Sequence, residues 1–201
     1  MKIAIIDYGM GNLLSLEGAI VKIKSDANIY ITHSDDLIKQ SDILFLPGVG
    51  HFKKAMESLH KLDLVNLIRD EVLIKKKPVM GICLGMQLLF SCSSEGGDTN
   101  GLNLIGGSVK KLVNGNYKIP HIGFNSVHYD DRSLMMKDII CNDFYFVHSY
   151  CVDDISEDLV KIYCNYNQRF IAAIESDNIW GTQFHPEKSQ TNGLILLNNF
   201  I

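Results

Sequence analysis

The sequence predicts a three-layer α/β fold, in which a mostly parallel central sheet carries helices on both faces and extends into antiparallel strands. In the first half of the chain, short apolar runs alternate with segments of helical periodicity. These runs are apolar at consecutive positions, which is typical of parallel strands buried on both faces. In the second half the strand candidates follow one another closely, which indicates hairpins or an antiparallel extension of the sheet.

The first half begins with a buried strand, because the run from Lys2 to Asp7 is almost entirely apolar. The expected strands span 2–7, 28–31, 42–46 and 78–82. The expected helices span 12–24, 51–75 in two pieces, and 84–90.

The second half contains strand candidates with short separations and ends in a helix. The expected strands span 105–112, 119–124, 144–148, 160–163, 170–174 and 180–184, and the helix spans 191–200. Because the sequence has no Pro/Ser-rich linker, repeat or low-complexity segment, we expect one domain over residues 1–201.

The composition excludes several classes of protein. Hydrophobic residues make up 46%, so a sizeable core is expected, and 19 basic against 23 acidic residues with no basic stripe argue against a nucleic-acid-binding protein. Five cysteines without a C-x-x-C pair favour a reducing, cytoplasmic compartment. The histidines show no metal-ligand spacing, so we expect no metal. The N-terminal apolar run is too short for a signal peptide and no run of 18 apolar residues occurs, so we expect no signal peptide and no membrane association.

The segment from Pro78 to Gln87 is the most informative in the sequence. An apolar strand breaks into a helix at Cys83, which Gly81 and Gly85 flank at two residues on either side. This spacing is that of a nucleophile elbow, in which a sharp turn exposes the nucleophile and glycines let the backbone crowd together. The amides that begin the helix favour the thiolate and offer the Leu84 N–H to an oxyanion. The simpler alternative is a buried cysteine at the end of a strand.

A thiolate nucleophile needs a base, and the base needs a group that orients it. His185 and Glu187 are the candidates, because Pro186 keeps His185 extended and side chains two apart in an extended segment share a face. Alone, His-Pro-Glu is a weak signal and a surface turn is the favoured interpretation, because surface turns often carry it. Together with Cys83 it predicts a Cys-His-Glu triad.

A glycine-rich loop follows the expected strand at 42–46, with the sequence Leu-Pro-Gly-Val-Gly-His over residues 46–51. Ligands of open parallel sheets bind at the carboxyl ends of the strands, which is also where Cys83 is expected. The loop is therefore a candidate for a second oxyanion donor, and the alternative is a simple strand-to-helix turn.

Four segments together resemble the class I (triad-type) glutamine amidotransferases: LPGVG at 46–50, GICLGMQLLF at 81–90, FVHSY at 146–150 and WGTQFHPEKS at 180–189. The segment DYGMGNL at 7–13 and the final KS narrow the resemblance to the glutaminase subunits of imidazole glycerol phosphate synthase. The resemblance runs along essentially the whole chain, and it implies a flavodoxin-like fold.

The resemblance also implies a mechanism without a cofactor. Cys83 would attack the side-chain amide of glutamine to form a γ-glutamyl thioester, and His185, oriented by Glu187, would protonate the departing ammonia and then activate water. The oxyanion would be held by Leu84, Gly48, Val49 and Gly50. The amino-acid end of glutamine would be held by Gln87, Glu95, Ser149 and Tyr150. His148 is expected to be structural, because the triad is already complete.

The family passes ammonia directly to a (βα)8-barrel cyclase subunit, which makes imidazole glycerol phosphate and AICAR in histidine biosynthesis. The resemblance thus implies a heterodimer, with Asn12, Phe124 and Lys188 at the docking face. Family members are nearly silent until the partner binds its substrate. A mobile loop at 48–50 would explain this property of the family, because one misdirected oxyanion donor costs roughly 3 kcal/mol of transition-state stabilisation.

Two positions depart from the histidine-pathway pattern: Phe124 stands where tryptophan is usual, and the Leu13-Leu14-Ser15 segment lacks an arginine. Both are expected to face the partner, so they leave open a paralogous glutaminase that supplies ammonia to a sugar-amidating enzyme of surface-glycan biosynthesis. Two alternatives of another class are a stand-alone cysteine amidase or peptidase and a non-catalytic binding module. Intact Cys83, His185 and Glu187 argue against the module.

Overall fold

A computed structural model of the chain describes residues 1–129, 132–153, 155 and 159–201. The strands are β1 (Lys2–Ile6), β2 (Asn28–Thr32), β3 (Ile43–Gly48), β4 (Val79–Cys83), β5 (Cys92–Ser93), β6 (Thr99–Asn100), β7 (Ser108–Lys111), β8 (His121–His128), β9 (Asp143–His148), β10 (Tyr150–Val152), β11 (Val160–Tyr166), β12 (Gln168–Ser176) and β13 (Ile179–Thr182). The helices are α1 (Leu13–Ile23), α2 (Asp35–Gln40), α3 (Phe52–Lys61), α4 (Leu64–Arg69), α5 (Leu84–Leu88) and α6 (Gln190–Phe200), with a π-helical turn η1 (Asp70–Ile74) and a 3-10 turn η2 (Pro186–Lys188).

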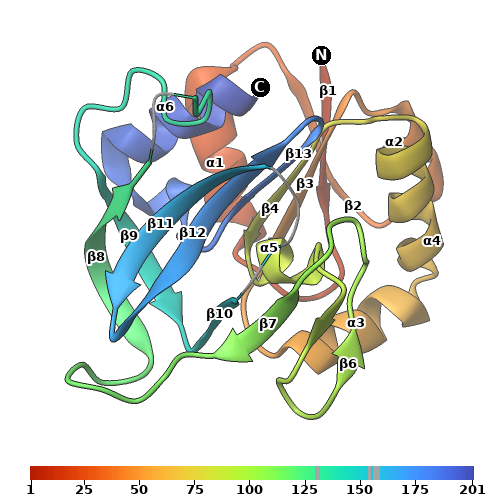
Figure 1. Cartoon of the computed structure of the whole chain (residues 1–201). Helices are drawn as coiled ribbons and strands as arrows, with labels where there is room; N and C mark the ends of the chain where they lie inside the picture. Colours follow the sequence, from red (N-terminus) through yellow and green to blue (C-terminus); the bar gives the residue numbers. More distant parts are fainter. Residues whose placement is uncertain (130–131, 154, 156–158) are drawn as a thin grey trace.

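The central sheet combines a parallel half and an antiparallel half (Figure 1). Strands β2, β1, β3, β4 and β13 lie side by side in that order and are parallel. Beyond β13 the pairing becomes antiparallel: β13 pairs with β12, and β12 pairs with β10. Strand β11 pairs with β12 and β8, and β8 pairs with β9, so these strands form an antiparallel extension on one side of the molecule.

Helices cover both faces of the parallel strands because consecutive side chains of each strand point to opposite faces. On β1, Ala4 and Ile6 pack in one apolar cluster with residues of α3 and α4, whereas Ile3 and Ile5 pack in another with residues of α1 and α6. Figure 1 shows α1 and α6 together on one side of the sheet and α2 and α4 on the other. The predicted three-layer α/β fold is therefore confirmed.

Most expected elements occur in the expected order, with shifts of one to a few residues at their ends. The expected strand at 105–112 is confined to β7, and the helix at 84–90 ends at Leu88. Helix α2 and the short strands β5, β6 and β10 were not predicted. The helical segment at 51–75 is in two pieces as expected, and its second piece continues into the π-helical turn η1.

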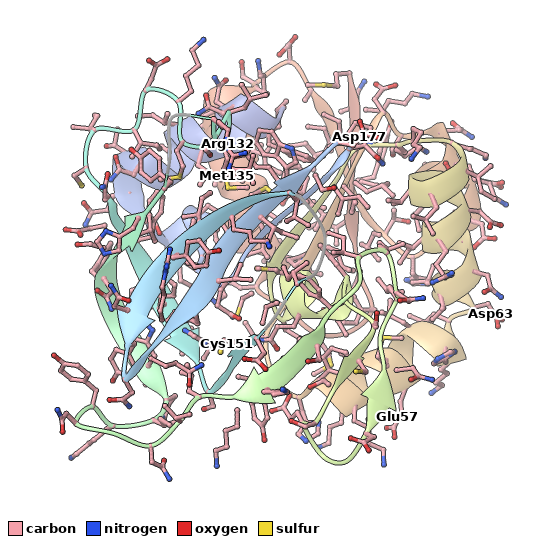
Figure 2. The ribbon with its side chains drawn as sticks, viewed as in Figure 1. Glu57, Asp63, Arg132, Met135, Cys151 and Asp177 are labelled. Atoms are coloured by element: carbon pink, nitrogen blue, oxygen red, sulfur yellow. The ribbon has the colours of Figure 1, made fainter. Side chains whose placement is uncertain are left out.

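Most charged side chains of the helices face solvent, whereas most apolar side chains of the same layers are buried. Figure 2 shows Glu57 and Asp63 directed outward beside α3 and α4, whereas Met135, which is fully buried, lies among the elements around α1 and α6. Within the described part of the chain, no helix has the length and apolar character needed to cross a membrane.

Strands β3, β4 and β13 end at the same edge of the parallel sheet. The last residues of β3 and β4, Gly48 and Cys83, are in register with each other. The last residue of β13, Thr182, pairs with Ile82 and is followed by the segment that contains His185. This edge of the sheet thus brings together Cys83, the start of the 48–50 loop and the segment that contains His185.

Candidate active site

Cys83 lies at the break between β4 and α5, and its backbone has φ 54° and ψ −109°. Residues other than glycine rarely adopt a positive φ. The neighbouring glycines permit the turn: a Cβ on Gly81 would come within 2.7 Å of the Met86 backbone, and one on Gly85 would come within 1.6 Å of the Leu46 carbonyl oxygen. The segment therefore has the strained strand-to-helix geometry that the glycine spacing predicts.

His185 and Glu187 form a buried pair next to the cysteine. His185 Nδ1 lies 2.8 Å from Glu187 Oε1. Burial works against a charged ring, but hydrogen bonds and charges of Cys83 and Glu187 together raise the pKa of His185 to about 10. His185 Nε2 makes no well-aligned hydrogen bond to any described residue, so this nitrogen is free to exchange a proton with the nearby sulfur.

The local reason for the His185–Glu187 contact differs from the prediction. His185 is extended, with φ −99° and ψ 98°, as expected from the proline that follows it. Glu187, however, lies within the 3-10 turn η2 rather than in an extended segment. The turn brings the carboxylate back to the ring, so the shared-face argument was wrong while the predicted pair is present.

The loop at 48–50 begins directly beside the cysteine. Tyr8 Oη donates a hydrogen bond of 2.8 Å to the Pro47 carbonyl, and a Cβ on Gly48 would come within 2.2 Å of the same Tyr8 oxygen. Gly50 has φ +114°, which favours glycine. Tyr8 therefore fixes the start of the loop, and the glycines give the following residues a backbone that bulkier residues would not tolerate.

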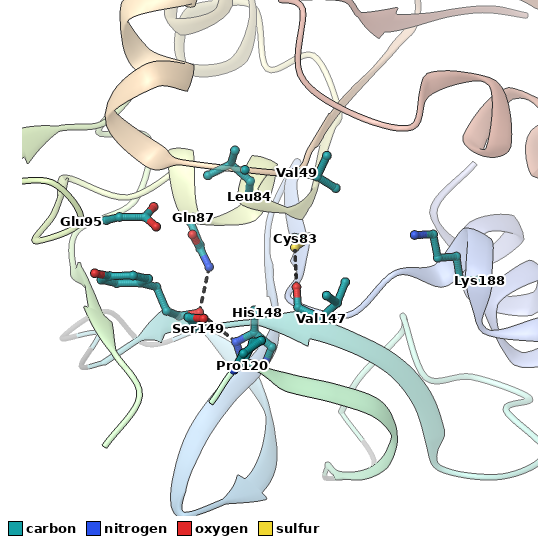
Figure 3. A pocket seen from close by; sticks show the side chains of 12 residues that line it. Val49, Cys83, Leu84, Gln87, Glu95, Pro120, Val147, His148, Ser149 and Lys188 are labelled. Carbon is teal, nitrogen blue, oxygen red and sulfur yellow. Dashed lines mark hydrogen bonds between the residues drawn. The ribbon is translucent and has the colours of Figure 1, made fainter. Parts of the chain in front are cut away.

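A cavity of about 410 Å³ opens above the cysteine (Figure 3). Val49 and Leu84 form one wall and Val147 and Pro120 the opposite wall, while the sulfur of Cys83 points between them. The remaining lining residues are Gly50, Gln87, Glu95, His148, Ser149, Tyr150 and Lys188.

Gln87 and Glu95, both expected to hold the amino-acid end of glutamine, lie on the same side of the cavity (Figure 3). Gln87 Nε2 donates to the Tyr150 carbonyl at 2.9 Å. Glu95 Oε2 accepts the Phe52 N–H at 2.7 Å, at the first residue of α3. Carboxylates are favourable at helix N-termini, so Glu95 also anchors the helix that follows the 48–50 loop.

Ser149 and Tyr150 line the cavity next to a pair of buried histidines, His121 and His148. His121 Nδ1 is 3.0 Å from His148 Nε2, and His148 Nδ1 is 2.8 Å from the Tyr150 carbonyl. Because a carbonyl only accepts, His148 carries its proton on Nδ1 and accepts the proton of His121 on Nε2. Burial lowers the pKa of His148 to about 3 and that of His121 to about 4, so both rings are neutral.

Phe124 and Lys188, which are both expected at the docking face, lie against the ring of Tyr145. Phe124, which is 52% exposed, packs edge-on against Tyr145 at 5.6 Å between centroids. Lys188 Nζ lies 5.8 Å from the centroid of the same ring. Asn12 is exposed in the loop before α1, and α1 packs against the turn that contains Lys188.

Sequence reasoning missed three contacts of the site. Cys83 Sγ lies 3.8 Å from the Val147 carbonyl and accepts from Gln183 Nε2 at 3.7 Å, and Tyr8 supports the loop. Gln183 directly precedes the Phe-His-Pro-Glu segment, but adjacency alone does not indicate its contact with the sulfur. Within the described ranges, no group of three or more His, Cys, Asp or Glu side chains is arranged to hold a metal ion.

The family model described as "Glutamine amidotransferase class-I" matches residues 4–201. Among curated proteins, the imidazole glycerol phosphate synthase subunit HisH of Aquifex aeolicus is 43% identical over 201 residues, covering 100% of this chain and 96% of that protein. The HisH subunit of Acinetobacter baylyi is 41% identical over 203 residues, covering 100% of this chain and 97% of that protein.

Solved structures resemble this fold at much lower sequence identity. The PurLQS structure from Thermotoga maritima has a TM-score of 0.71 at 15% identity, covering 98% of this chain and 96% of that chain. The glutaminase domain of Trypanosoma brucei CTPS with bound acivicin has a TM-score of 0.68 at 17% identity, covering 98% of this chain and 92% of that chain. At such identities the likeness concerns the fold.

Proposed function

The chain belongs to the class I glutamine amidotransferases, and from this premise we propose how its residues hydrolyse glutamine as the glutaminase subunit of imidazole glycerol phosphate synthase in histidine biosynthesis. The full-length identity of 43% to a HisH subunit supports the function. The observation that carries the mechanism is the buried His185–Glu187 pair beside Cys83. Cys83 in turn lines a cavity of suitable size for an amino acid.

In the first half of the reaction, the Cys83 thiolate attacks the side-chain carbonyl carbon of glutamine. The carbonyl π electrons move to oxygen, and the N–H groups of Leu84 and of the loop containing Val49 and Gly50 hold the resulting oxyanion. His185 then gives its Nε2 proton to the departing nitrogen as the C–N bond breaks. Ammonia leaves, and a γ-glutamyl thioester remains on the sulfur.

In the second half, water attacks the thioester and His185 Nε2 takes its proton. The C–S bond breaks, which releases glutamate and returns the thiolate. Glu187 holds the ring through Nδ1 and stabilises its charged form, as the acidic member of a triad does. The raised pKa of His185 supports this role, because a charged ring must be present when the leaving nitrogen needs a proton.

Glutamine itself is held with its amino-acid end toward Glu95, Gln87, Ser149 and Tyr150. The free Glu95 oxygen accepts from the α-ammonium group, while Oε2 remains on the Phe52 N–H. Because Phe52 follows the 48–50 loop after a single residue, binding of glutamine and the position of the loop are linked through one carboxylate.

The ammonia passes to a (βα)8-barrel cyclase subunit that docks over Asn12, Phe124 and Lys188. Lys188 lines the cavity on the side of Cys83 opposite Glu95 (Figure 3), which leaves the ammonia a direction of departure away from the bound amino-acid group. The exposed Phe124 ring supplies the apolar contact for docking.

The deciding experiment measures glutamate release from glutamine by the purified chain, alone and with the cyclase subunit of the same organism plus its nucleotide ligand. A large stimulation is expected. No stimulation with folded protein and reduced Cys83 would transfer the assignment to the sugar-amidating paralogue, and fast release by the chain alone would indicate an independent amidase.

A further inference from the structure

Gln183 is fully buried and contacts the nucleophile. Its side-chain Nε2 lies 3.7 Å from Cys83 Sγ, an ordinary distance for an N–H group and sulfur. Its Oε1 accepts from Gln87 Nε2 at 2.9 Å. Its backbone N–H is held by the Ala172 carbonyl at 2.7 Å, so the segment that carries it is fixed to strand β12.

The direction of these hydrogen bonds follows from one backbone carbonyl. The Tyr150 carbonyl can only accept, so the side-chain nitrogen of Gln87, and not its oxygen, faces it. The same nitrogen has a second N–H, which points at the oxygen of Gln183. Gln183 therefore presents its own N–H, and not its oxygen, to Cys83.

The Tyr150 carbonyl is itself fixed by the histidine pair. It accepts a second hydrogen bond from His148 Nδ1 at 2.8 Å, and His148 is held by His121, which contacts Asn125 Nδ2 at 3.3 Å. His121 also stacks between Tyr166 and Phe146, with centroids at 3.9 and 4.7 Å. A neutral network thus extends from the half-buried Asn125 on β8 through buried groups to the sulfur, and its hydrogen bonds fix the orientation of each group.

The two contacts of the sulfur favour different protonation states. The Val147 carbonyl accepts only from the thiol, whereas the Gln183 N–H is a stronger partner of the thiolate, because hydrogen bonds to ions are about twice as strong as neutral ones. We propose that Gln183 is a further catalytic residue, whose N–H stabilises the anion left when the proton of Cys83 Sγ passes to His185 Nε2. The inference rests on the proposed function, in which this thiolate attacks glutamine.

The test compares the wild-type chain with Gln183→Met, which keeps the side-chain length but removes the donor. Alkylation of each cysteine by iodoacetamide at pH 7 is followed by peptide mass spectrometry, with the exposed Cys141 as internal reference. Loss of one hydrogen bond to an ion predicts about tenfold slower alkylation of Cys83. The kcat for glutamate release in the complex should fall by a similar factor, with little change in KM.

The matched control is Gln168→Met. Gln168 Nε2 donates to Cys151 Sγ at 3.6 Å, the same kind of contact on another cysteine (Cys151 is labelled in Figure 2). This variant should alkylate Cys83 at the wild-type rate. Folding is read in the same spectra, because the buried Cys151 and Cys164 react only when the chain unfolds.

An unchanged Cys83 rate in folded Gln183→Met would overturn the inference. If Gln183→Met unfolds, the same alkylation is measured on Gln183→Asn, which withdraws the amide from the sulfur by one methylene. Slower alkylation of Cys83 would support the inference, and an unchanged rate would overturn it. Failure of the proposed function is distinguishable, because it would appear as absent glutamate release by the wild-type complex, whereas alkylation does not require turnover.

Discussion

Two buried histidines near Cys83, His185 and His148, differ in charge. His185 is 2% exposed and His148 is 6% exposed, so burial alone would lower the pKa of both. The pKa of His185 is nevertheless raised to about 10, whereas that of His148 is lowered to about 3.

The partners of the two rings explain the difference. His185 contacts the Glu187 carboxylate and the sulfur of Cys83, which are both acceptors for its protons. His148 contacts a backbone carbonyl and the neutral ring of His121, and neither stabilises a charge enough to offset burial. Burial removes water from both, and the protein groups that replace water decide which histidine can move a proton.

Cys83→Ala is the largest disruption of this comparison. It removes the nucleophile, so glutamate release in the complex should fall by roughly 10⁴-fold or more. It also removes a sulfur that raises the pKa of His185, so that pKa should move down toward that of His148. Activity is measured as glutamate release, and the ring by NMR titration; retained turnover would contradict the mechanism, while cyclase binding should be unaffected.

Glu187→Gln makes the surroundings of His185 more like those of His148. An amide holds no charge against Nδ1 and also permits the wrong tautomer, so kcat should fall by about 10²–10⁴-fold. Glu175→Gln is the matched control, because Glu175 is a buried carboxylate that accepts the Leu134 and Met135 N–H groups of a turn outside the site. If both variants lost kcat equally, the effect would be one of folding.

The pH dependence of stability should have opposite signs for the two rings. The pKa of His185 is raised above 6.5, so its contribution is complete below pH 6.5 and is lost as pH rises toward 10. The pKa of His148 is lowered, so its contribution is complete above pH 6.5 and is lost as pH falls toward 3.

Denaturant unfolding of His185→Gln and His148→Gln from pH 5 to pH 9 checks these signs. The difference from wild type should shrink at high pH for the first and at low pH for the second, with slopes up to about 1.4 kcal/mol per pH unit. The exposed His33, changed to glutamine, controls for the loss of a histidine. Parallel curves for all three variants would contradict the assigned charges.

The sequence predicts those features of the structure that depend on residues close together along the chain. The elbow at Cys83 is indicated by the glycines two residues away on either side. Only glycine fits at these two positions, because a Cβ there would clash with the backbone of Met86 or Leu46. The parallel strands follow from runs that are apolar on both faces. The nearness of His185 and Glu187 was also predicted, although a 3-10 turn and not an extended segment produces it.

Contacts that depend on the packing of distant strands could not be predicted. His121 and His148 meet because β8 and β9 pair in a register that places them opposite each other. Gln183 reaches Cys83 because β13 pairs with β4, and nothing in the order of residues indicates that pairing. For the same reason the second role of Glu95, at the first residue of α3, is visible only in the folded chain.

Asn125→Ala should have the smallest effect. It tests what keeps the His121–His148 pair neutral. Asn125 Nδ2 contacts His121 Nε2 at 3.3 Å and the Asn165 carbonyl at 3.2 Å, at the outer end of the network. Its loss should cost about 1 kcal/mol of unfolding free energy, because each bond is modest and water can replace it. Since burial and not Asn125 keeps the two rings uncharged, their NMR signals should still show neutral tautomers at pH 6, and kcat should change less than twofold. A charged His148 in this variant would show that Asn125, and not burial, keeps the two rings neutral. The contrast between His148 and His185 would then fail, because the charge of His148, like that of His185, would be set by its hydrogen-bond partners.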